Sequence, residues 1–224
     1  MDAFAHCREL IAANDKVRFW ASLYAPADRR GGLHALYAFD IELASVHARV
    51  RDPVAGEIRL QWWREALEGA RPGEAAANPV AAALRETVQR YGLSVPLLLA
   101  LIDARGADLY DEPLADIDAY GAATDGAIVA SAAHVLGGAG ETVEHIARHA
   151  GLARTFAAAG DVAGARGHLD AAAALQPSVP EQILPALLPI AVIRPELGRA
   201  THLPPWRQQW LIWRAARNPG RIFK

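Results

Sequence analysis

Apolar residues recur along this chain at spacings of three and four positions. Between residues 33 and 48, Leu33, Leu36, Ile41 and two later alanines follow this spacing, which stacks them on one face of an α-helix. A half-buried strand would alternate apolar and polar residues instead. Similar patterns predict helices over residues 58–67, 80–91, 95–109, 117–136, 143–156, 183–197 and 206–216.

Glycine and proline fall between these periodic stretches, for example at Pro53, Pro79, Pro96 and the Gly137-Gly138 pair. Alanine is abundant and favours close helix packing, whereas β-branched clusters with a period of two are missing from the sequence. A length of 224 residues is enough to build one core. We therefore expect an all-α fold, a single-domain helical bundle over residues 1–224.

Two segments depart from the regular pattern. Residues 160–180 carry four helix breakers and weak apolar periodicity, so we expect a loop with one short helix over residues 169–175. The last segment has Trp206, Trp210 and Trp213 on one helical face, with arginines around them. Packing of this helix on the bundle through its tryptophans is the favoured interpretation, and contact with a membrane interface is the alternative.

Composition narrows the class of protein. The formal net charge is −2 and the sequence pI is about 6.4, which argues against a nucleic-acid partner. Cys7 is the sole cysteine, so an intrachain disulfide and a thiolate zinc site are both excluded. The N-terminal sequence lacks the apolar core of a signal peptide, and the longest apolar stretch is short and contains Pro185 and Pro189. We expect a soluble, cytoplasmic protein.

Two passages resemble the squalene/phytoene synthase family. They are RFWASLYAPADRRGGLHALYAFDIELASVHARV at residues 18–50 and RLQWWREAL at residues 59–67. The resemblance extends over about residues 18–217 and is weakest at residues 160–180. It implies the isoprenoid-synthase fold, in which head-to-head prenyl condensation uses Mg²⁺ held by paired aspartates on two facing helices.

The resemblance places the early metal-binding positions at Ala44, Ser45 and Ala48, which cannot hold Mg²⁺. Asp40 lies a full turn earlier, and Glu42 points about 160° away from Ala44. We expect Asp40 to form hydrogen bonds within the bundle rather than to bind a metal.

The later motif resembles residues 151–167, with a helix that ends before an ARG-like turn at residues 165–167. Its two aspartate positions are Ala159 and Ala163, and Asp161 lies between them. Even a shifted alignment would supply one carboxylate, whereas the chemistry needs a pair. We therefore expect no metal site and no cofactor.

Two further groups of residues have the spacing of metal ligands. Asp108, Asp111 and Glu112 have the spacing of a magnesium triad, but Pro113 follows at once, so solvated acids at a helix end are favoured. Surface histidines are favoured over a metal pair for the two residues at positions 145 and 149.

Four arginines are candidates for an anion pocket, because guanidinium groups bind phosphate in a bidentate manner. They are Arg18, Arg29, Arg30 and Arg59. Solvation at the surface is the favoured role of Arg29 and Arg30. Core packing is favoured for Trp62 and Trp63.

The FDIELA sequence at residues 39–44 is similar to the FNVELA-like sequence of a subgroup that lacks the aspartate motifs. That subgroup includes the mitochondrial assembly factor for respiratory complex I and its bacterial relatives. The resemblance implies a non-catalytic assembly factor, or an isoprenoid- or lipid-binding scaffold, with a membrane-protein client and peripheral attachment at the inner membrane. The residues expected to line a substrate-like cavity are Phe19, Tyr37, Asp40, Ala44, Arg59 and Trp63.

The alternative is an active prenyltransferase that condenses two allylic diphosphates with Mg²⁺. Its unconventional ligands would be Asp40, Asp108, Asp111 and Asp161. A third hypothesis keeps the cavity for an isoprenoid, such as a quinone tail, without turnover.

Overall fold

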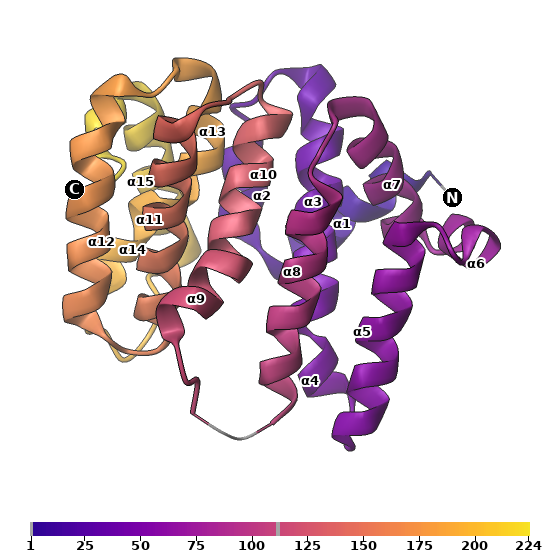
Figure 1. Ribbon diagram of the computed structural model, residues 1–224. Coiled ribbons are helices and arrows are strands. Elements are labelled where there is room, and N and C mark those ends of the chain that lie inside the picture. The colour runs from indigo at the N-terminus through magenta and orange to yellow at the C-terminus, as the bar shows by residue number, and fades with distance from the viewer. Residues whose placement is uncertain (1, 111–112) are drawn as a thin grey trace.

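The structure is a computed structural model that describes residues 2–110 and 113–224, and within those residues it is helical with no strand (Figure 1). The helices are α1 (Ala3–Asn14), α2 (Lys16–Ser22), α3 (Ala27–Ala44), α4 (Val46–Arg49), α5 (Pro53–Glu68), α6 (Pro72–Ala77), α7 (Pro79–Tyr91), α8 (Val95–Arg105), α9 (Ile117–Gly121), α10 (Ala127–Val135), α11 (Glu141–Ala158), α12 (Val162–Leu175), α13 (Leu184–Leu187), α14 (Ile193–Glu196) and α15 (Pro205–Arg217). Short 3-10 turns are η1 (Gly106–Leu109), η3 (Gln176–Ser178), η4 (Glu181–Ile183), η5 (Leu188–Val192) and η6 (Pro219–Arg221), and η2 (Ala122–Gly126) is a π-helical turn. The all-α prediction is confirmed.

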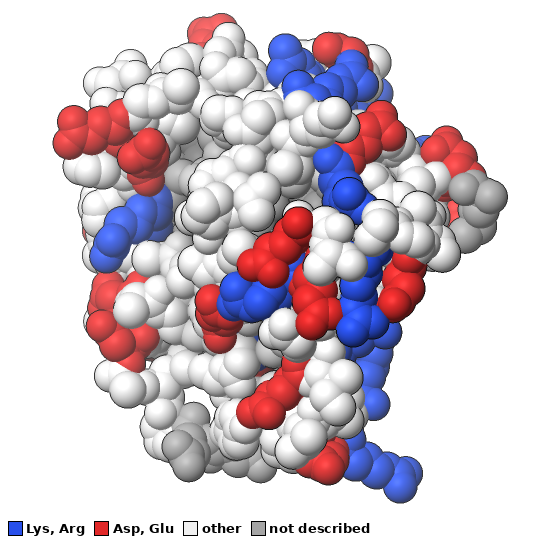
Figure 2. Space-filling model, turned by 45° about the vertical axis from the view of Figure 1, so that its right-hand side comes forward, with Lys and Arg blue, Asp and Glu red and all other residues white. Residues whose placement is uncertain are grey.

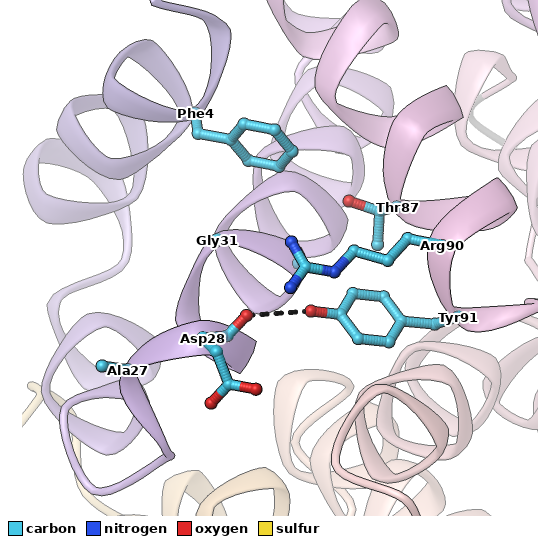
Figure 3. A pocket seen from close by; sticks show the side chains of 8 residues that line it. Phe4, Ala27, Asp28, Gly31, Thr87, Arg90 and Tyr91 are labelled. Atoms are coloured by element: carbon cyan, nitrogen blue, oxygen red, sulfur yellow. Dashed lines mark hydrogen bonds between the residues drawn. The ribbon is translucent and has the colours of Figure 1, made fainter.

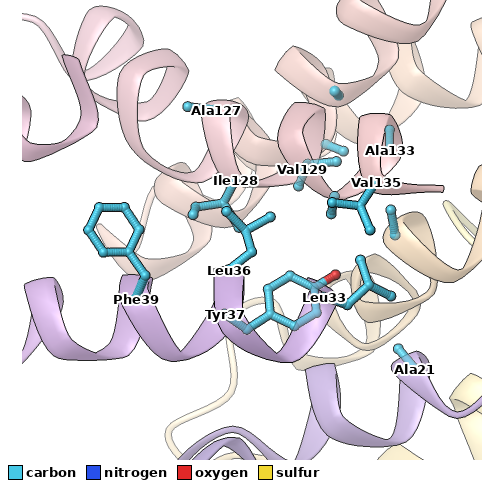
Figure 4. Packing of buried hydrophobic residues seen from close by; sticks show 14 of the residues in the cluster. Ala21, Leu33, Leu36, Tyr37, Phe39, Ala127, Ile128, Val129, Ala133 and Val135 are labelled. Atoms are coloured by element: carbon cyan, nitrogen blue, oxygen red, sulfur yellow. The ribbon is translucent and has the colours of Figure 1, made fainter. Parts of the chain in front are cut away.

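The helix α3 runs through the core of the bundle. Every residue from Gly32 to Asp40 is buried, on all sides of the helix, as expected for a helix enclosed by others. Helices α1, α7 and α10 pack against it. Leu36 and Phe39 of α3 lie toward Ile128 of α10 in the centre of this packing (Figure 4).

Helix boundaries follow local capping chemistry that is legible in the sequence. The Asp52 carboxylate accepts a hydrogen bond from the Val54 amide at the start of α5, and Gly69 ends that helix with a φ of 85°. Asn78 caps α7 in the same way, and Gly92 ends it with a φ of 66°. A polar N-cap before a proline and a left-handed glycine at the C-terminus are favourable helix ends.

The prediction of a loop at residues 160–180 is wrong in its first part, because α12 occupies Val162–Leu175. The Asp161 side chain caps it by accepting a hydrogen bond from the Gly164 amide at 2.8 Å. Gly164 is needed for contact rather than for a turn, since a Cβ there would lie 2.3 Å from the Phe156 ring. Small residues therefore bring α12 against α11, and this kind of packing leaves weak apolar periodicity.

The prediction of a helix over residues 183–197 is only partly right. The segment is divided into η4, α13, η5 and α14. Pro185 lies in the first turn of α13 and Pro189 in the first turn of η5. Backbone amides in the first turn of a helix have no intrahelical acceptor, so a proline is tolerated there although it has no N–H group.

The last helix, α15, was predicted in nearly its observed length, but its favoured orientation is wrong. Trp206, Trp210 and Trp213 are 69%, 46% and 44% exposed. The buried residues of α15 are instead Leu211, Ile212 and Ala215, on the side that packs against η5 and α2. The inward stripe is aliphatic, so the tryptophans are left on the outside.

His34 is buried on α3 and links this helix to α2. Its Nε2 lies 3.0 Å from the Ser22 hydroxyl oxygen, and that hydroxyl donates to the Phe19 carbonyl. Burial first, and then the nearby charges of Arg8 and Arg30, lower the pKa of His34 to about 4. The folded protein therefore holds this imidazole neutral at pH values where an exposed histidine is already protonated.

We predict that stability falls as the pH is lowered from about 6.5 to 4, because the unfolded chain binds a proton that the folded His34 does not. The loss should reach about 3 kcal/mol in the free energy of unfolding. Urea unfolding at a series of pH values measures it. The variant His34→Gln should flatten this dependence, and the exposed-site variant His145→Gln should not. An unchanged slope in His34→Gln would contradict the assignment.

Candidate functional site

A network of buried and half-buried ion pairs lies in the interior of the bundle, and Asp40, one of the residues predicted to line a cavity, is its centre. Arg18 Nη1 donates to Asp40 Oδ2 at 2.6 Å, and Arg105 Nη2 donates to Asp40 Oδ1 at 2.9 Å. Arg18 belongs to α2, Asp40 to α3, and Arg105 is the last residue of α8. Both carboxylate oxygens of Asp40 are thus occupied by guanidinium groups. The expectation that Asp40 forms hydrogen bonds within the bundle is confirmed.

A second branch leads from Arg18 to Asp125 in η2. Asp125 Oδ1 lies 3.4 Å from Arg18 Nη2 and 3.2 Å from Arg154 Nε, and Asp125 Oδ2 accepts from the Thr155 hydroxyl at 3.0 Å. Asp15, which caps α2, lies 3.5 Å from both Arg18 Nε and Arg154 Nη2. This branch ties η2 and α11 to the N-terminal helices.

A third branch leads from Arg105 to the region after α8. Arg105 Nη1 donates to Asp108 Oδ2 at 3.2 Å and to the Tyr120 phenolic oxygen at 2.8 Å. The Tyr120 hydroxyl in turn donates to Asp108 Oδ1 at 2.6 Å. Asp108 is therefore half-buried and bonded on both oxygens, rather than solvated as predicted.

Glycines bring η2 and α11 close enough to build the second branch. A Cβ on Gly151 of α11 would lie 2.2 Å from the Gly126 amide nitrogen, and one on Gly121 would lie 2.8 Å from the Thr155 hydroxyl. The π-helical turn η2 therefore packs backbone to backbone on α11. Thr155 and Arg154 follow Gly151 by one turn, so this approach delivers both side chains to Asp125.

Electrostatics fix the protonation state of the network. Burial by itself would raise the pKa of Asp40, but the charges and hydrogen bonds of Arg18 and Arg105 outweigh it and hold that pKa well below its ordinary value. Burial would lower the pKa of Arg18, yet the facing aspartates raise it. Asp40 therefore stays ionised, and it is too weak a base to remove a proton from a substrate.

The arrangement leaves the carboxylates unsuited to a metal ion. Arginines stand between Asp40, Asp108 and Asp125. Among the residues that the structure describes, no group of three or more histidine, cysteine, aspartate and glutamate side chains has the geometry to hold a metal. Mg²⁺ needs oxygens that are free to coordinate it, whereas these oxygens already face cations.

The remaining predicted metal ligands do not join the network. Asp161 is exposed and caps α12. Ala159 follows the end of α11 and Ala163 lies in the first turn of α12, so the sequence ARG at residues 165–167 is inside a helix and forms no turn. Asp111 and Glu112 lie outside the described residues.

The residues predicted to line a cavity occupy different environments. Tyr37, Asp40 and Trp63 are buried in the packed core, and Phe39 packs edge-on against Trp63 with ring centroids 5.2 Å apart. Phe19 is half-buried, whereas Ala44 and Arg59 are exposed. The six side chains thus do not face one space, and their role as a ligand cavity stays a prediction.

The four arginines proposed for an anion pocket are likewise dispersed. Arg18 is in the network, while Arg59 lies at the surface 3.6 Å from Glu42. Arg29 donates to the Val135 carbonyl and Arg30 to the carbonyls of Leu23 and Ala25. Basic and acidic side chains are interspersed on the face shown in Figure 2. Arg71, for example, pairs with Glu65 and Glu74.

A surface pocket of about 260 Å³ lies between α1, α3 and α7, away from the network. Phe4 forms one wall, and the Tyr91 hydroxyl closes the other by donating to the Asp28 carbonyl at 3.0 Å (Figure 3). The Arg90 guanidinium is held over the Tyr91 ring, 5.4 Å from its centroid. None of the residues predicted for the synthase-like cavity lines this pocket.

Sequence reasoning missed most of the network. Asp40, Arg18 and Asp108 were candidates, but Asp15, Arg105, Tyr120, Asp125, Arg154 and Thr155 were not. A signal was present in the GAATDGA sequence, where an acid between two glycines interrupts a predicted helix. Its partners are far away in the chain and could not be identified from spacing.

Comparison with known proteins gives a consistent assignment. The model of the squalene/phytoene synthase family matches residues 11–156. The rat protein named NADH dehydrogenase (ubiquinone) complex I, assembly factor 6 is 31% identical over 156 residues, which are 68% of this chain and 47% of the relative. The human protein of that name is 29% identical over 66% of this chain and 46% of its own length. The chain spans about half the length of these curated relatives.

A crystal structure of a dehydrosqualene synthase in complex with ligand has the same fold. It superposes with a TM-score of 0.67 at 13% sequence identity and covers 96% of this chain and 95% of the synthase chain. The likeness at this identity establishes the fold, and the prediction of an isoprenoid-synthase bundle is confirmed.

We predict that Asp40→Asn destabilises the protein by about 3 to 5 kcal/mol, because it leaves the buried Arg18 and the half-buried Arg105 facing a neutral side chain of the same size. Urea unfolding measures the change in the free energy of unfolding. The matched control is Asp103→Asn, which removes the exposed partner of Arg64 and should cost less than about 1 kcal/mol. Equal effects of the two variants would contradict the importance of the buried pair.

Replacement of Gly151 by alanine tests the close approach of α11 and η2. The added methyl group would overlap the Gly126 backbone, so Gly151→Ala should lower the free energy of unfolding by about 3 kcal/mol. Gly167→Ala is the control in α12, since a Cβ there meets nothing within 4 Å. That variant should be neutral or more stable by about 0.5 kcal/mol. A tolerated Gly151→Ala would show that the backbones do not meet.

Proposed function

Because the chain belongs to the squalene/phytoene synthase family and arginines occupy its interior carboxylates, we propose that it is a non-catalytic member acting as an assembly factor for respiratory complex I. The single observation that carries the first half of this proposal is that Asp40 pairs with both Arg18 and Arg105. A synthase must hold two diphosphates through bridging Mg²⁺ ions, and these need carboxylates that are free to coordinate. In this protein the negative charge of Asp40 is instead neutralised by Arg18 and Arg105.

The second half of the proposal rests on the relatives. The mammalian proteins that share about 30% identity with this chain carry the name of a complex I assembly factor. The match covers 68% of the present chain, and the family model spans residues 11–156, which include α3 and the network. We further propose that residues 1–224 form one domain, since one solved synthase covers nearly the whole chain.

An assembly factor of this kind binds a client rather than a substrate. We propose that the client is a membrane-associated subunit or intermediate of the complex, and that the protein works as a peripheral protein beside the inner membrane. The likeness to a synthase fold also supports the proposal that the protein binds an isoprenoid or a lipid without converting it.

Purified protein incubated with farnesyl diphosphate and Mg²⁺ should release no diphosphate above a blank without protein, because the interior carboxylates cannot bind the metal. A coupled phosphate assay measures the release. The variant Asp161→Ser serves as the control, since serine still caps α12 but removes the carboxylate that the alternative would use. Release that depends on Mg²⁺ and is lost in Asp161→Ser would establish an active prenyltransferase instead.

In cells that lack the native gene, assembled complex I on native gels should be reduced severalfold. Wild-type protein and Asp161→Ser should restore it equally. A normal amount of complex I in the deleted cells would contradict the role in assembly, whatever the outcome of the enzyme assay.

A further inference from the structure

The exposed tryptophans of α15 form a continuous apolar stripe. Trp206, Trp210 and Trp213, which we call the tryptophan face, follow one another at spacings of four and three residues and so project to one side of the helix. Trp206 is the most exposed large apolar side chain among the residues described. The opposite side of α15 is already covered by η5 and α2. The tryptophan face is therefore the side of α15 that remains available to a partner.

Basic side chains accompany this stripe without acids of their own segment. Residues 197–224 contain six lysines and arginines and no aspartate or glutamate, whereas residues 1–196 contain 17 basic and 25 acidic residues. The Arg214 guanidinium lies 4.6 Å from the Trp210 ring centroid, and the Arg217 guanidinium lies 5.0 Å from that of Trp213. The positive charge is thus held directly against the apolar stripe.

The acid that precedes this segment is occupied. Glu196 Oε1 accepts hydrogen bonds from Gln208 Nε2 at 2.8 Å and from the Leu203 amide at 3.0 Å, and Glu196 Oε2 lies 3.0 Å from His202 Nδ1. The Glu196 carboxylate therefore holds the residues at the start of α15 in place and does not pair with the arginines beside the tryptophans.

We propose that the tryptophan face docks on a bilayer surface that contains anionic phospholipids. Indole rings are amphipathic and favour the level of the lipid headgroups, and arginines beside them can reach the phosphates. A second copy of this chain is a poorer partner, because an isologous contact would bring two basic faces together. No described helix is long and apolar enough to cross a membrane. The inference stands on this surface alone and does not depend on the proposed function.

The test is flotation of the purified protein with vesicles. The protein should float with vesicles of phosphatidylcholine that contain about one third phosphatidylglycerol, and about tenfold less with phosphatidylcholine alone. Raising the salt concentration from about 0.1 M to 0.5 M should release most of it, because the attraction is screened. Failure to bind anionic vesicles, or equal binding to both kinds, would overturn the proposal.

Paired variants separate this surface from general stickiness. Trp210→Ala with Trp213→Ala should lower binding to anionic vesicles about tenfold, since two interfacial anchors are lost. Val54→Ala with Ile58→Ala removes an apolar pair on α5 that is more exposed than the two tryptophans and should leave binding unchanged. Circular dichroism checks that both variants are folded. An equal loss of vesicle binding in the two double variants would also overturn the proposal. So would a wild-type dimer in light scattering that becomes a monomer in the tryptophan variant.

Discussion

Asp40 lies on α3 in the core of the bundle, and its buried carboxylate stays ionised because two arginines donate hydrogen bonds to it. An unpaired carboxylate at this depth would cost several kcal/mol, so the positions of α2 and α8 relative to α3 are tied to the placement of Arg18 and Arg105. Each of these arginines then requires a further acid, Asp125 for one and Asp108 for the other. Neutralisation of one charge thus extends into a network that joins helices from both halves of the chain.

That network is consistent with the proposal that this member of the family does not bind catalytic Mg²⁺. Each oxygen of Asp40, Asp108 and Asp125 faces an arginine, a tyrosine hydroxyl or a threonine hydroxyl. A divalent cation would have to displace guanidinium groups that carry the same sign of charge and are already desolvated. The ion pairs themselves link α2, α3, α8 and η2.

Local features of the sequence predicted the helices well and the network poorly. The extents of α7 and α15 were nearly right, because proline, N-cap and periodicity signals are contained within one segment. The start of α5 was predicted too late, because the helix already begins at Pro53. The first half of α12 was missed because its contacts use alanine and glycine, and the sequence alone does not show the surface on which these small residues pack. Asp40 was expected to be bonded inside the bundle, but its partners lie 22 and 65 residues away. Pairing over such distances follows from the tertiary fold and leaves no periodic trace.

The orientation of α15 shows the same limit and has a larger consequence. Periodicity places Trp206, Trp210 and Trp213 on one face, but a helix with an aliphatic stripe and an aromatic stripe can bury either one. The bundle selects Leu211, Ile212 and Ala215, whose smaller side chains allow closer approach to η5. Acids elsewhere in the chain outnumber bases, and the C-terminal segment is basic. An anionic surface would therefore attract α15 and repel the rest of the molecule, so one charge asymmetry sets both the attachment and the orientation of the bundle above the bilayer.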